Sequence, residues 1–281
     1  RVRSSAASDV YKRQVLDVVP EINDPAIAQP VAAQHGYVQF EHVTFSYPGA
    51  EEPALSDISL SACPGEVTAI IGGTGSGKST LVNLIPRFYD VNEGRVLVDG
   101  VDVRDMPQAE LRAKIGVVPQ KAVLFSGTID ENIRYGKEDA SPAEVRQAAN
   151  TAQATEFVAD MPAGFDSVIA QGGINVSGGQ KQRLSIARAL VRKPEIYIFD
   201  DSFSALDFAT DARLRAALKG ETTGATVFIV SQRVGTIMDA DRIIVLDEGR
   251  VAGIGTHRQL LETSPVYREI VESQFALEEV A

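Results

Sequence analysis

The sequence predicts an α/β fold whose central sheet is mostly parallel. Three short apolar runs, at residues 67–71, 196–199 and 225–230, have the length and the continuous apolar character of strands buried on both faces. Segments with a helical pattern alternate with these runs, as in doubly wound sheets. A β-rich segment precedes this part of the chain, and a helix-rich segment at about 121–191 interrupts it. We therefore expect an antiparallel β subdomain and an α-helical subdomain on either side of the sheet.

The composition is that of a soluble globular protein with one large domain or two lobes. Among 281 residues, 44% are hydrophobic and 23% are charged. The formal net charge of −11 and the pI of about 4.8 argue against a nucleic-acid partner. No apolar run approaches the ~18 residues that span a bilayer, so a role at a membrane would require another segment or another chain.

The cysteine and the histidines point to no chemistry of their own. Cys63 is the only cysteine, which excludes a disulfide framework and fits a reducing compartment. We expect it to be a buried structural thiol. The three histidines, His35, His42 and His257, are scattered and lack the spacing of a metal site.

The first 36 residues differ from the rest of the chain. Arg1–Gln14 is basic and rich in small residues, has no apolar periodicity and lacks the apolar region of a signal peptide. It resembles translated sequencing-adapter DNA, so we expect a non-native or disordered segment, with the natural chain continuing upstream. Residues 15–36 carry Pro20, Pro25 and Pro30 among small and acidic residues, which is the composition of a linker.

The remaining elements follow in order along a domain at 37–264 and a helical tail at 265–281. Further strands are expected at 37–47, around 58–60, at 115–118, and in two hairpins, 95–98 with 101–103 and 242–246 with 251–254. Helices are expected from near Lys78 and at 144–157, 181–191, 209–219 and 234–240. The amphipathic tail is expected to pack on the domain or on a neighbour.

A glycine-rich segment between an apolar strand and a predicted helix matches the phosphate-binding pattern G-x-x-x-x-G-K-[ST]. Glycines let backbone N–H groups turn toward phosphate oxygens, and the start of the next helix adds a positive dipole end. Lys78 is expected to reach the β- and γ-phosphates, and the Ser79 hydroxyl to coordinate Mg²⁺. A glycine-rich turn without a ligand is the alternative. The expected phosphate-loop residues are Gly72, Gly73, Thr74, Gly75, Ser76, Gly77, Lys78, Ser79 and Thr80.

Asp200 follows the apolar run Tyr197-Ile198-Phe199, at the carboxyl end of a predicted buried strand. A carboxylate at that place can hold Mg²⁺ through water, as the Walker B aspartate does. An aspartate at a strand end is also ordinary. By itself, therefore, Asp200 leaves both interpretations open.

A second anion site is predicted at residues 176–183, Val-Ser-Gly-Gly-Gln-Lys-Gln-Arg. A serine and two glycines open a helix there, which offers N–H groups and a hydroxyl to a phosphate. With the phosphate loop and Asp200 in this order, residues 37–261 resemble the ATP-binding cassette (ABC) ATPases, although Val176 replaces the leucine of the family signature. The resemblance implies a head-to-tail pair of domains. In such a pair Ser177, Gly178, Gly179 and Gln180 complete the ATP site of the other subunit.

The resemblance also implies roles for residues outside the two loops. Tyr47 matches the aromatic residue that stacks on adenine, although by the sequence alone it also fits a core or strand-end tyrosine. Gln120 matches the Q-loop glutamine, which senses Mg²⁺ and the γ-phosphate. Residues 204–207 match the D-loop at the dimer interface. Residues 124–133 and the linker resemble the exporter branch of the family.

Two positions depart from the family pattern. Asp201 stands where active members carry a glutamate that polarises the attacking water, so its carboxylate lies about 1.5 Å farther back, the length of one C–C bond. Placement of a general base contributes ~10²–10⁴-fold to a rate. Gln232 stands in place of the switch histidine, and it can hydrogen-bond a γ-phosphate but cannot become a cation. Together the two changes imply a site that binds ATP and seldom cleaves it.

The sequence therefore predicts an ATPase domain of a membrane exporter, at the cytoplasmic face of the cell membrane, with ATP and Mg²⁺. The expected partners are a different ABC ATPase subunit, whose competent site uses this chain's signature, and a transmembrane domain. No nucleic-acid partner is expected. The alternative is a non-hydrolytic scaffold that binds ATP and clamps its partner. An ABC protein of translation or DNA repair, or an importer ATPase, fits the acidic charge and the linker less well.

Overall fold

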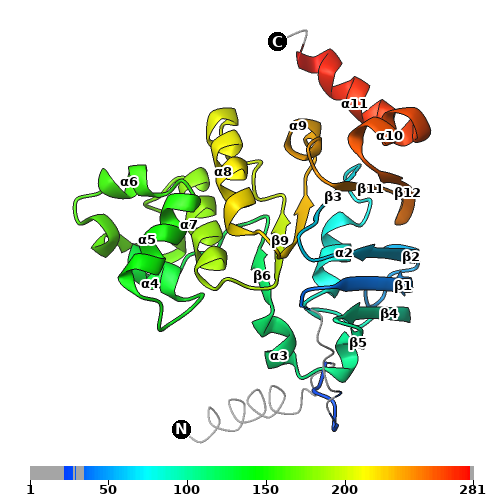
Figure 1. The fold of residues 1–281 in the computed structure, drawn as a ribbon, viewed down its shortest axis with the longest axis horizontal. Coiled ribbons are helices and arrows are strands. Elements are labelled where there is room, and N and C mark those ends of the chain that lie inside the picture. The colour runs from blue at the N-terminus through cyan, green and yellow to red at the C-terminus, as the bar shows by residue number, and fades with distance from the viewer. Residues whose placement is uncertain (1–21, 28, 30–34, 279–281) are drawn as a thin grey trace, which may run out of the picture.

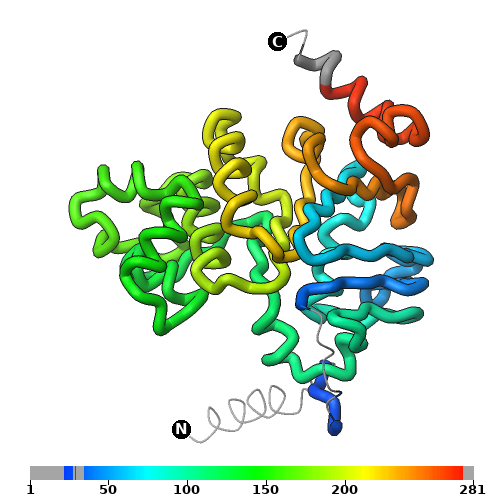
Figure 2. The backbone as a smooth tube through the Cα atoms, viewed as in Figure 1, coloured from blue at the N-terminus to red at the C-terminus, as the bar shows by residue number. Residues whose placement is uncertain are grey.

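The computed structural model describes residues 22–27, 29 and 35–278, and Figure 1 shows how they are arranged. A six-stranded central sheet lies between a four-stranded β subdomain and a group of helices, α4 to α7. The backbone view in Figure 2 makes the same division clear, with the helical group in green on one side and the C-terminal segment in red at the opposite side. Arg1–Gln14 and most of the predicted linker lie outside the described residues.

The elements follow the predicted alternation of strands and helices. The strands are β1 Val38–Phe45, β2 Leu55–Ala62, β3 Val67–Gly72, β4 Glu93–Val98, β5 Val101–Asp102, β6 Ile115–Val118, β7 Gly127–Thr128, β8 Val168–Ile169, β9 Ile196–Asp200, β10 Thr226–Val230, β11 Arg242–Asp247 and β12 Arg250–Gly255. The α-helices are α2 Lys78–Leu84, α3 Gln108–Ala113, α4 Ile129–Arg134, α5 Pro142–Thr151, α6 Thr155–Ala159, α7 Gly178–Val191, α8 Phe208–Glu221, α9 Val234–Ile237, α10 His257–Thr263 and α11 Pro265–Glu278. Short 3₁₀ turns lie at Val103–Asp105, Gly164–Asp166 and Gln171–Gly173.

The central sheet is mostly parallel, as predicted. Its order is β12-β11-β3-β10-β9-β6, and only the β11–β12 pair is antiparallel. Val230 pairs with both Ile70 and Asp200, so β3, β10 and β9 end at nearly the same level. The carboxyl ends of these strands therefore share one edge, the place where open α/β sheets bind ligands.

The strands of this sheet are apolar throughout because both faces are covered. Ile70, Ile198 and Phe228 belong to the core on the side of the β subdomain. Their neighbours Ile71, Phe199 and Ile229 belong to the core on the side of the helices. Successive residues of a strand point to opposite faces, so a continuous apolar run is needed here.

The β subdomain is a separate antiparallel sheet with the order β2-β1-β4-β5. Residues of β1 alternate between buried and accessible, with Val38, Phe40 and Val43 in the core. The register shifts after Phe40 and again after Val43, which marks irregular pairing or bulges in β1. One face of this sheet thus packs on the central sheet and on α2.

Three helix starts in the helical group carry capping boxes. Thr128, Ser141 and Ser177 each accept a hydrogen bond from the backbone N–H three residues on, and a glutamate or glutamine at that position bonds back. The group is tied to the sheet by Gln182, whose Nε2 donates to the Pro119 carbonyl at 3.1 Å. The start of α7 is therefore fixed by its own sequence, and its middle is fixed to the end of β6.

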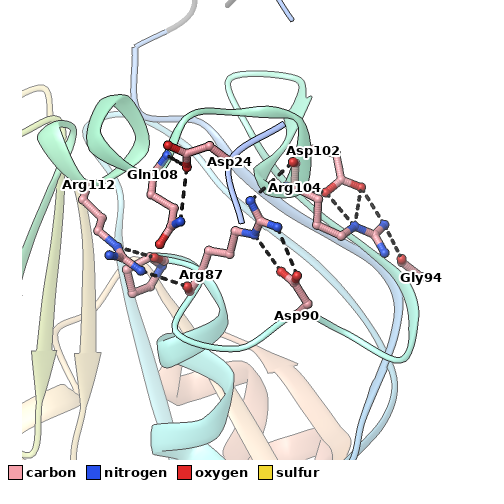
Figure 3. A network of polar contacts seen from close by, with 9 residues as sticks. Asp24, Arg87, Asp90, Gly94, Asp102, Arg104, Gln108 and Arg112 are labelled. Carbon is pink, nitrogen blue, oxygen red and sulfur yellow. Dashed lines mark hydrogen bonds and ion pairs between the residues drawn. The ribbon is translucent and has the colours of Figure 1, made fainter. Parts of the chain in front are cut away.

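A polar network holds described residues of the N-terminal segment against the α3 region (Figure 3). Asp24 Oδ1 accepts hydrogen bonds from Gln108 N at 2.9 Å and from Gln108 Nε2 at 3.2 Å. The backbone hydrogen bond from Gln108 lowers the pKa of Asp24. Close by, the buried Arg87 pairs with Asp90 and Arg104 pairs with Asp102. Gln29 N also donates to Asp105 O at 3.2 Å, so two points of the segment contact the same region.

Several sequence expectations about local structure are wrong. The single helix expected at 144–157 is two helices, α5 and α6, because Gln153 adopts a left-handed backbone conformation with φ 56° and breaks the turn. The helix expected at 234–240 ends at Ile237, and the strand expected at 101–103 ends at Asp102 because a 3₁₀ turn begins. Cys63 is exposed rather than buried, since it opens the surface turn that leads to Glu66.

Other elements were not foreseen. They are α3, α4, α10 and the short β7–β8 pair. Most of them are short, and tertiary packing decides their state more than local pattern does. In the part of the chain that the structure describes, no helix has the length and the apolar character needed to cross a membrane.

Candidate functional site

The predicted phosphate loop joins β3 to α2 and curls around its own backbone. A Cβ on Gly72 would lie 2.1 Å from the Leu246 carbonyl oxygen, and a Cβ on Gly77 would lie 2.7 Å from Leu55 Cδ2, so neither position accepts a side chain. Gly75 and Gly77 have φ values of 83° and 95°, which glycine adopts without strain. Apart from the glycine itself and its two chain neighbours, no described residue has an atom within 4 Å of a Cβ placed on Gly73 or Gly75. The loop is thus closed toward the sheet and open on its outer side.

Lys78 lies under this loop with its ammonium group turned inward. Its Nζ donates to Gly72 O at 2.9 Å and to Gly73 O at 2.6 Å. Burial lowers the pKa of Lys78, whereas the carboxylates of Asp201 and Asp200 act in the opposite direction. The cation is therefore held at the centre of the loop, near the edge where anions can approach.

Ser79 and Asp200, predicted to be metal ligands, lie in contact although they are far apart in the sequence. The Ser79 hydroxyl donates to Asp200 Oδ1 at 2.9 Å. Burial raises the pKa of Asp200, and the Ser79 hydrogen bond opposes this shift. A hydroxyl oxygen beside a carboxylate is the hard oxygen donor set that Mg²⁺ prefers. These residues fit a magnesium ion.

Gln120, Asp201 and Gln232 reach the same edge from the ends of three strands. Gln120 follows β6, Asp201 follows β9, and Gln232 follows β10. Gln120 Nε2 donates to Asp201 Oδ2 at 3.2 Å. Asp201 has a φ of 44°, an unusual backbone conformation for a residue with a side chain, and its N–H is held by the Val230 carbonyl at 3.0 Å.

A cavity of about 370 Å³ connects these groups. Its lining residues are Tyr47, Ala54, Thr74, Gly75, Gly77, Lys78, Ser79, Thr80, Gln120, Asp200, Asp201, Val230 and Gln232. Of the predicted loop residues, Gly72, Gly73 and Ser76 are not part of this lining. The Ser76 hydroxyl is buried and has no hydrogen-bond partner among the described residues. A cavity that holds the Lys78 ammonium group beside an open glycine loop fits the phosphates of a nucleotide.

Tyr47 stands at the rim of this cavity and is not a core residue, since 37% of it is exposed. Its hydroxyl lies 3.0 Å from Thr80 Oγ1. Its ring makes edge contacts with Phe45 at 4.9 Å and with Tyr89 at 5.3 Å between centroids. These contacts fix the ring while leaving part of it accessible, as a base-stacking platform requires.

The predicted signature residues do not reach the cavity. Ser177 begins α7, and its hydroxyl accepts from Gln180 N at 3.2 Å while Gln180 Oε1 accepts from Ser177 N at 2.8 Å. A Cβ on Gly179 would lie 3.1 Å from the Ala205 carbonyl, so the signature and the predicted D-loop are neighbours. None of Ser177, Gly178, Gly179 and Gln180 lines the cavity. The structure therefore separates the two predicted anion sites.

Some residues at the site were missed by sequence reasoning. Ala54 and Val230 line the cavity, and Arg233 crosses from the loop after β10 to donate to Ser204 O at 3.1 Å. Arg233 is next to Gln232 in the sequence, but no sequence pattern indicates that it contacts Ser204. Ala54 lies in the turn before β2, and no motif marks it.

The known proteins that this chain resembles are ABC transporter proteins. The family model described as "ABC transporter" matches residues 55–204. The chain is 50% identical over 243 residues to an ABC transporter ATP-binding protein of Bacillus subtilis, covering 86% of this chain and 42% of that protein. It is 44% identical to a β-(1→2)glucan export ATP-binding/permease protein of Rhodopseudomonas palustris, covering 95% of this chain and 44% of that protein. An ATP-dependent lipid A-core flippase of Chromobacterium violaceum is 42% identical, with 97% of this chain and 46% of that protein covered.

A solved structure resembles the whole described fold. A bacterial Atm1-family ABC exporter with ATP bound superposes with a TM-score of 0.92 at 38% identity. The match covers 97% of this chain and 48% of that chain. This chain thus spans less than half the length of the relatives it matches.

Proposed function

This chain belongs to the ABC transporter family, and from that premise we propose that it is the ATPase domain of an exporter whose own ATP site is impaired in hydrolysis. The observation that carries the proposal is the gathering of Lys78, Ser79, Asp200 and Asp201 around one cavity, while the signature at Ser177–Gln180 stays outside it. The four residues around the cavity are those that one nucleotide needs. The signature residues would meet a nucleotide held by another subunit.

We propose that binding uses the cavity from the adenine end to the γ-phosphate. Tyr47 would stack on the base, the N–H groups of residues 72–80 would hold the phosphates, and Lys78 would leave its loop carbonyls to contact the β- and γ-phosphates. Ser79 and Asp200 would hold Mg²⁺. When bound, the ion supplies neutralisation of phosphate charge.

The impairment is proposed from two side chains at the γ-phosphate end. Asp201 is one methylene shorter than the glutamate of active relatives, and its carboxylate already accepts a hydrogen bond from Gln120. A base set back by about 1.5 Å loses much of the ~10²–10⁴-fold that general-base catalysis contributes. Gln232 can donate a hydrogen bond but cannot carry a positive charge near neutral pH.

The partners are part of the same proposal. A second, competent ABC ATPase subunit would receive Ser177, Gly178, Gly179 and Gln180 at its own ATP. A transmembrane domain would bind the exposed apolar side chains that follow Gln120 in the sequence: Val123, Phe125 and Tyr135 are 55%, 43% and 65% exposed. The Phe125 and Tyr135 rings lie 4.4 Å apart, and an apolar patch of this kind is typical of an interaction site.

The domain limits belong to this proposal too. Residues 15–36 would link the transmembrane domain to the ATPase domain at 37–264, and the contact of Asp24 with Gln108 supports a linker that runs along the domain surface. Residues 265–281 would be the C-terminal tail. The assembled transporter would place this chain on the cytoplasmic face of the cell membrane.

The other candidate is a non-hydrolytic scaffold, and a single-turnover assay distinguishes the two. The chain is mixed with γ-labelled ATP and Mg²⁺ over a range of protein concentrations, and bound and cleaved nucleotide are followed separately. Binding with very slow cleavage that does not depend on concentration supports the impaired site. Cleavage that rises with the square of concentration would mean a competent homodimer and would overturn the asymmetric pair. Adding a competent partner then separates an exporter ATPase, which turns over, from a scaffold, which does not.

A further inference from the structure

The C-terminal helix α11 holds the loop that carries Gln232. Gln274 Oε1 accepts a hydrogen bond from Val234 N at 2.8 Å, and Gln274 Nε2 donates to the Gln232 carbonyl at 2.6 Å. One amide side chain thus binds the backbone on both sides of Arg233. A side-chain amide carries both a donor and an acceptor, so glutamine can make both bonds at once.

The hydrogen bond from Val234 N to Gln274 replaces a helix cap that the local sequence does not provide. Helix α9 begins at Val234, and its N-cap residue Arg233 makes no side-chain capping bond. The first N–H groups of a helix have no partner within the helix. Gln274 supplies that partner from an element 40 residues away.

Gln274 is delivered by a helix that is firmly docked. Tyr267 is fully buried, and its hydroxyl lies 2.8 Å from His257 Nδ1. Val271 is 8% exposed, and Tyr267, Val271 and Gln274 follow one another at spacings of four and three residues, so they share one face of α11. The position of the Gln274 amide is therefore set by the packing of the helix.

The other side of the same loop is tied to the D-loop. Arg233 Nη2 donates to Ser204 O at 3.1 Å, and its guanidinium lies 5.4 Å from the centroid of the Phe208 ring. Ser231 Oγ accepts from Arg233 N at 3.0 Å. The loop at 231–234 is thus fixed between α11 on one side and residues 204–208 on the other.

We propose that Gln274 is a positioning residue that sets the backbone of Gln232 and thereby the reach of its side chain into the nucleotide cavity. Gln232 lines that cavity, and its carbonyl is one of the two groups that Gln274 holds. The C-terminal helix α11 then helps to position the γ-phosphate end of the site. This inference rests on the proposed function for the role of Gln232. The two hydrogen bonds of Gln274, to Val234 N and to the Gln232 carbonyl, are observed in the structure.

The test uses two variants and two measurements on the whole chain. Gln274→Ala removes both bonds. Gln274→Glu keeps an oxygen that accepts from Val234 N but has no donor for the Gln232 carbonyl. Amide hydrogen exchange at Val234 is measured without nucleotide, and the affinities for ADP and for a non-hydrolysable ATP analogue are measured separately. Glu272→Ala, at an exposed position of the same helix, is the control.

In Gln274→Ala, exchange at Val234 should become about three- to tenfold faster, the effect of one lost hydrogen bond. The ratio of ATP-analogue affinity to ADP affinity should fall by a similar factor, because only the analogue carries the γ-phosphate that Gln232 meets. Gln274→Glu should keep the Val234 exchange rate of the parent while the affinity ratio still falls. Glu272→Ala should change neither quantity.

Three results would overturn the inference. One is an unchanged Val234 exchange rate in Gln274→Ala. Another is an unchanged affinity ratio in both variants. The third is equal acceleration of the Val234, Tyr267 and Val271 amides in both variants, which would make Gln274 a mere anchor of the helix. If the parent chain binds neither nucleotide, the proposed function fails. The exchange data alone then decide whether Gln274 holds the loop at Gln232–Val234.

Discussion

Gln120 donates a 3.2 Å hydrogen bond to the carboxylate of Asp201, across a sequence separation of 81 residues. The two residues follow β6 and β9, which are adjacent parallel strands, so the ends of the strands bring them together. The proposed base of this site is therefore already held by the side chain proposed to sense the γ-phosphate.

Restoring the two family residues should restore hydrolysis at this chain's own site. The double variant Asp201→Glu with Gln232→His regains a base at full reach and a side chain that can be a cation, so single-turnover cleavage should rise by about 10²-fold. The rate is measured with labelled ATP and with a competent partner present. Asp201→Asn with Gln232→His is the matched control, because it has no base, and it should stay at the parent rate. No gain in the first variant would contradict the proposed roles of Asp201 and Gln232.

Removing the ammonium group of the phosphate loop should abolish most of the ATP affinity. Lys78→Ala deletes a cation that is 8% exposed and lines the cavity, and a charged hydrogen bond of this kind contributes about 1.5–3 kcal/mol. The dissociation constant should rise by about 10- to 100-fold in equilibrium binding. Lys181→Ala is the control, since Lys181 also bonds a glycine carbonyl, Gly172 O at 3.0 Å, but lies on α7 outside the cavity. Equal losses in both variants would contradict the assigned site.

Blocking the signature should stop the partner's site while leaving this chain's own ATP in place. Ser177→Arg puts a bulky cation at the start of α7, where the partner's nucleotide is proposed to bind. Turnover of the assembled pair should be lost, and ATP binding by this chain alone should be unchanged. Ser141→Arg is the control matched to Ser177→Arg, because it removes the same type of capping box from α5. The loss of such a box costs about 1 kcal/mol in stability. Full turnover in Ser177→Arg would refute the shared site.

Asp99 should be a large contributor to stability. It is fully buried, and its Oδ1 accepts from Gly36 N at 2.7 Å and from Tyr37 N at 2.9 Å while its Oδ2 lies 2.9 Å from Lys114 Nζ. Asp99→Ala leaves Lys114 without one of its carboxylate partners and two N–H groups unpaired, so the free energy of unfolding should fall by about 3–5 kcal/mol.

Chemical denaturation checks this value, and Asp57→Ala is the control. Asp57 has a positive φ of 51°, close to the 53° of Asp99, but its side chain is 68% exposed in its pair with His42. An exposed pair contributes about 0–1 kcal/mol. Similar losses in the two variants would mean that burial of the Asp99 network does not set its contribution.

The contribution of Glu144 to stability should depend on pH. The hydrogen bond from Lys137, followed by those from Ser141, lowers the pKa of Glu144 from 4.5 to about 2. The unfolded chain binds the proton more readily, so the stabilising effect is fully present above about pH 4.5 and is lost as the pH falls toward 2. The difference in unfolding free energy between the parent and Glu144→Gln should be largest at neutral pH and shrink through this window. Denaturation curves at a series of pH values measure it. Lys137→Gln should weaken the pH dependence, and a difference that stays constant with pH would exclude the ion pair as its cause.

The mostly parallel central sheet, the alternation of its strands with helices and the glycine loop were predictable because each depends on neighbouring residues. Apolar runs give buried strands, and the loop needs only a strand, glycines, a lysine and a helix start in succession. The residues at the ends of β6, β9 and β10 were predictable from the family resemblance, and parallel strands then bring Gln120, Asp201 and Gln232 to one edge.

Tertiary structure alone decided the features that depend on distant partners. The sequence pattern at 144–157 is helical throughout, yet Gln153 turns out of the helix as the chain folds back onto α7, where Arg183 Nη1 donates to the Gln153 carbonyl at 2.8 Å. The Ser79–Asp200 and Gln274–Gln232 bonds join residues that no local pattern connects. Sequence periodicity reports which face of an element is buried, whereas a hydrogen bond between two elements depends on how their faces meet in space.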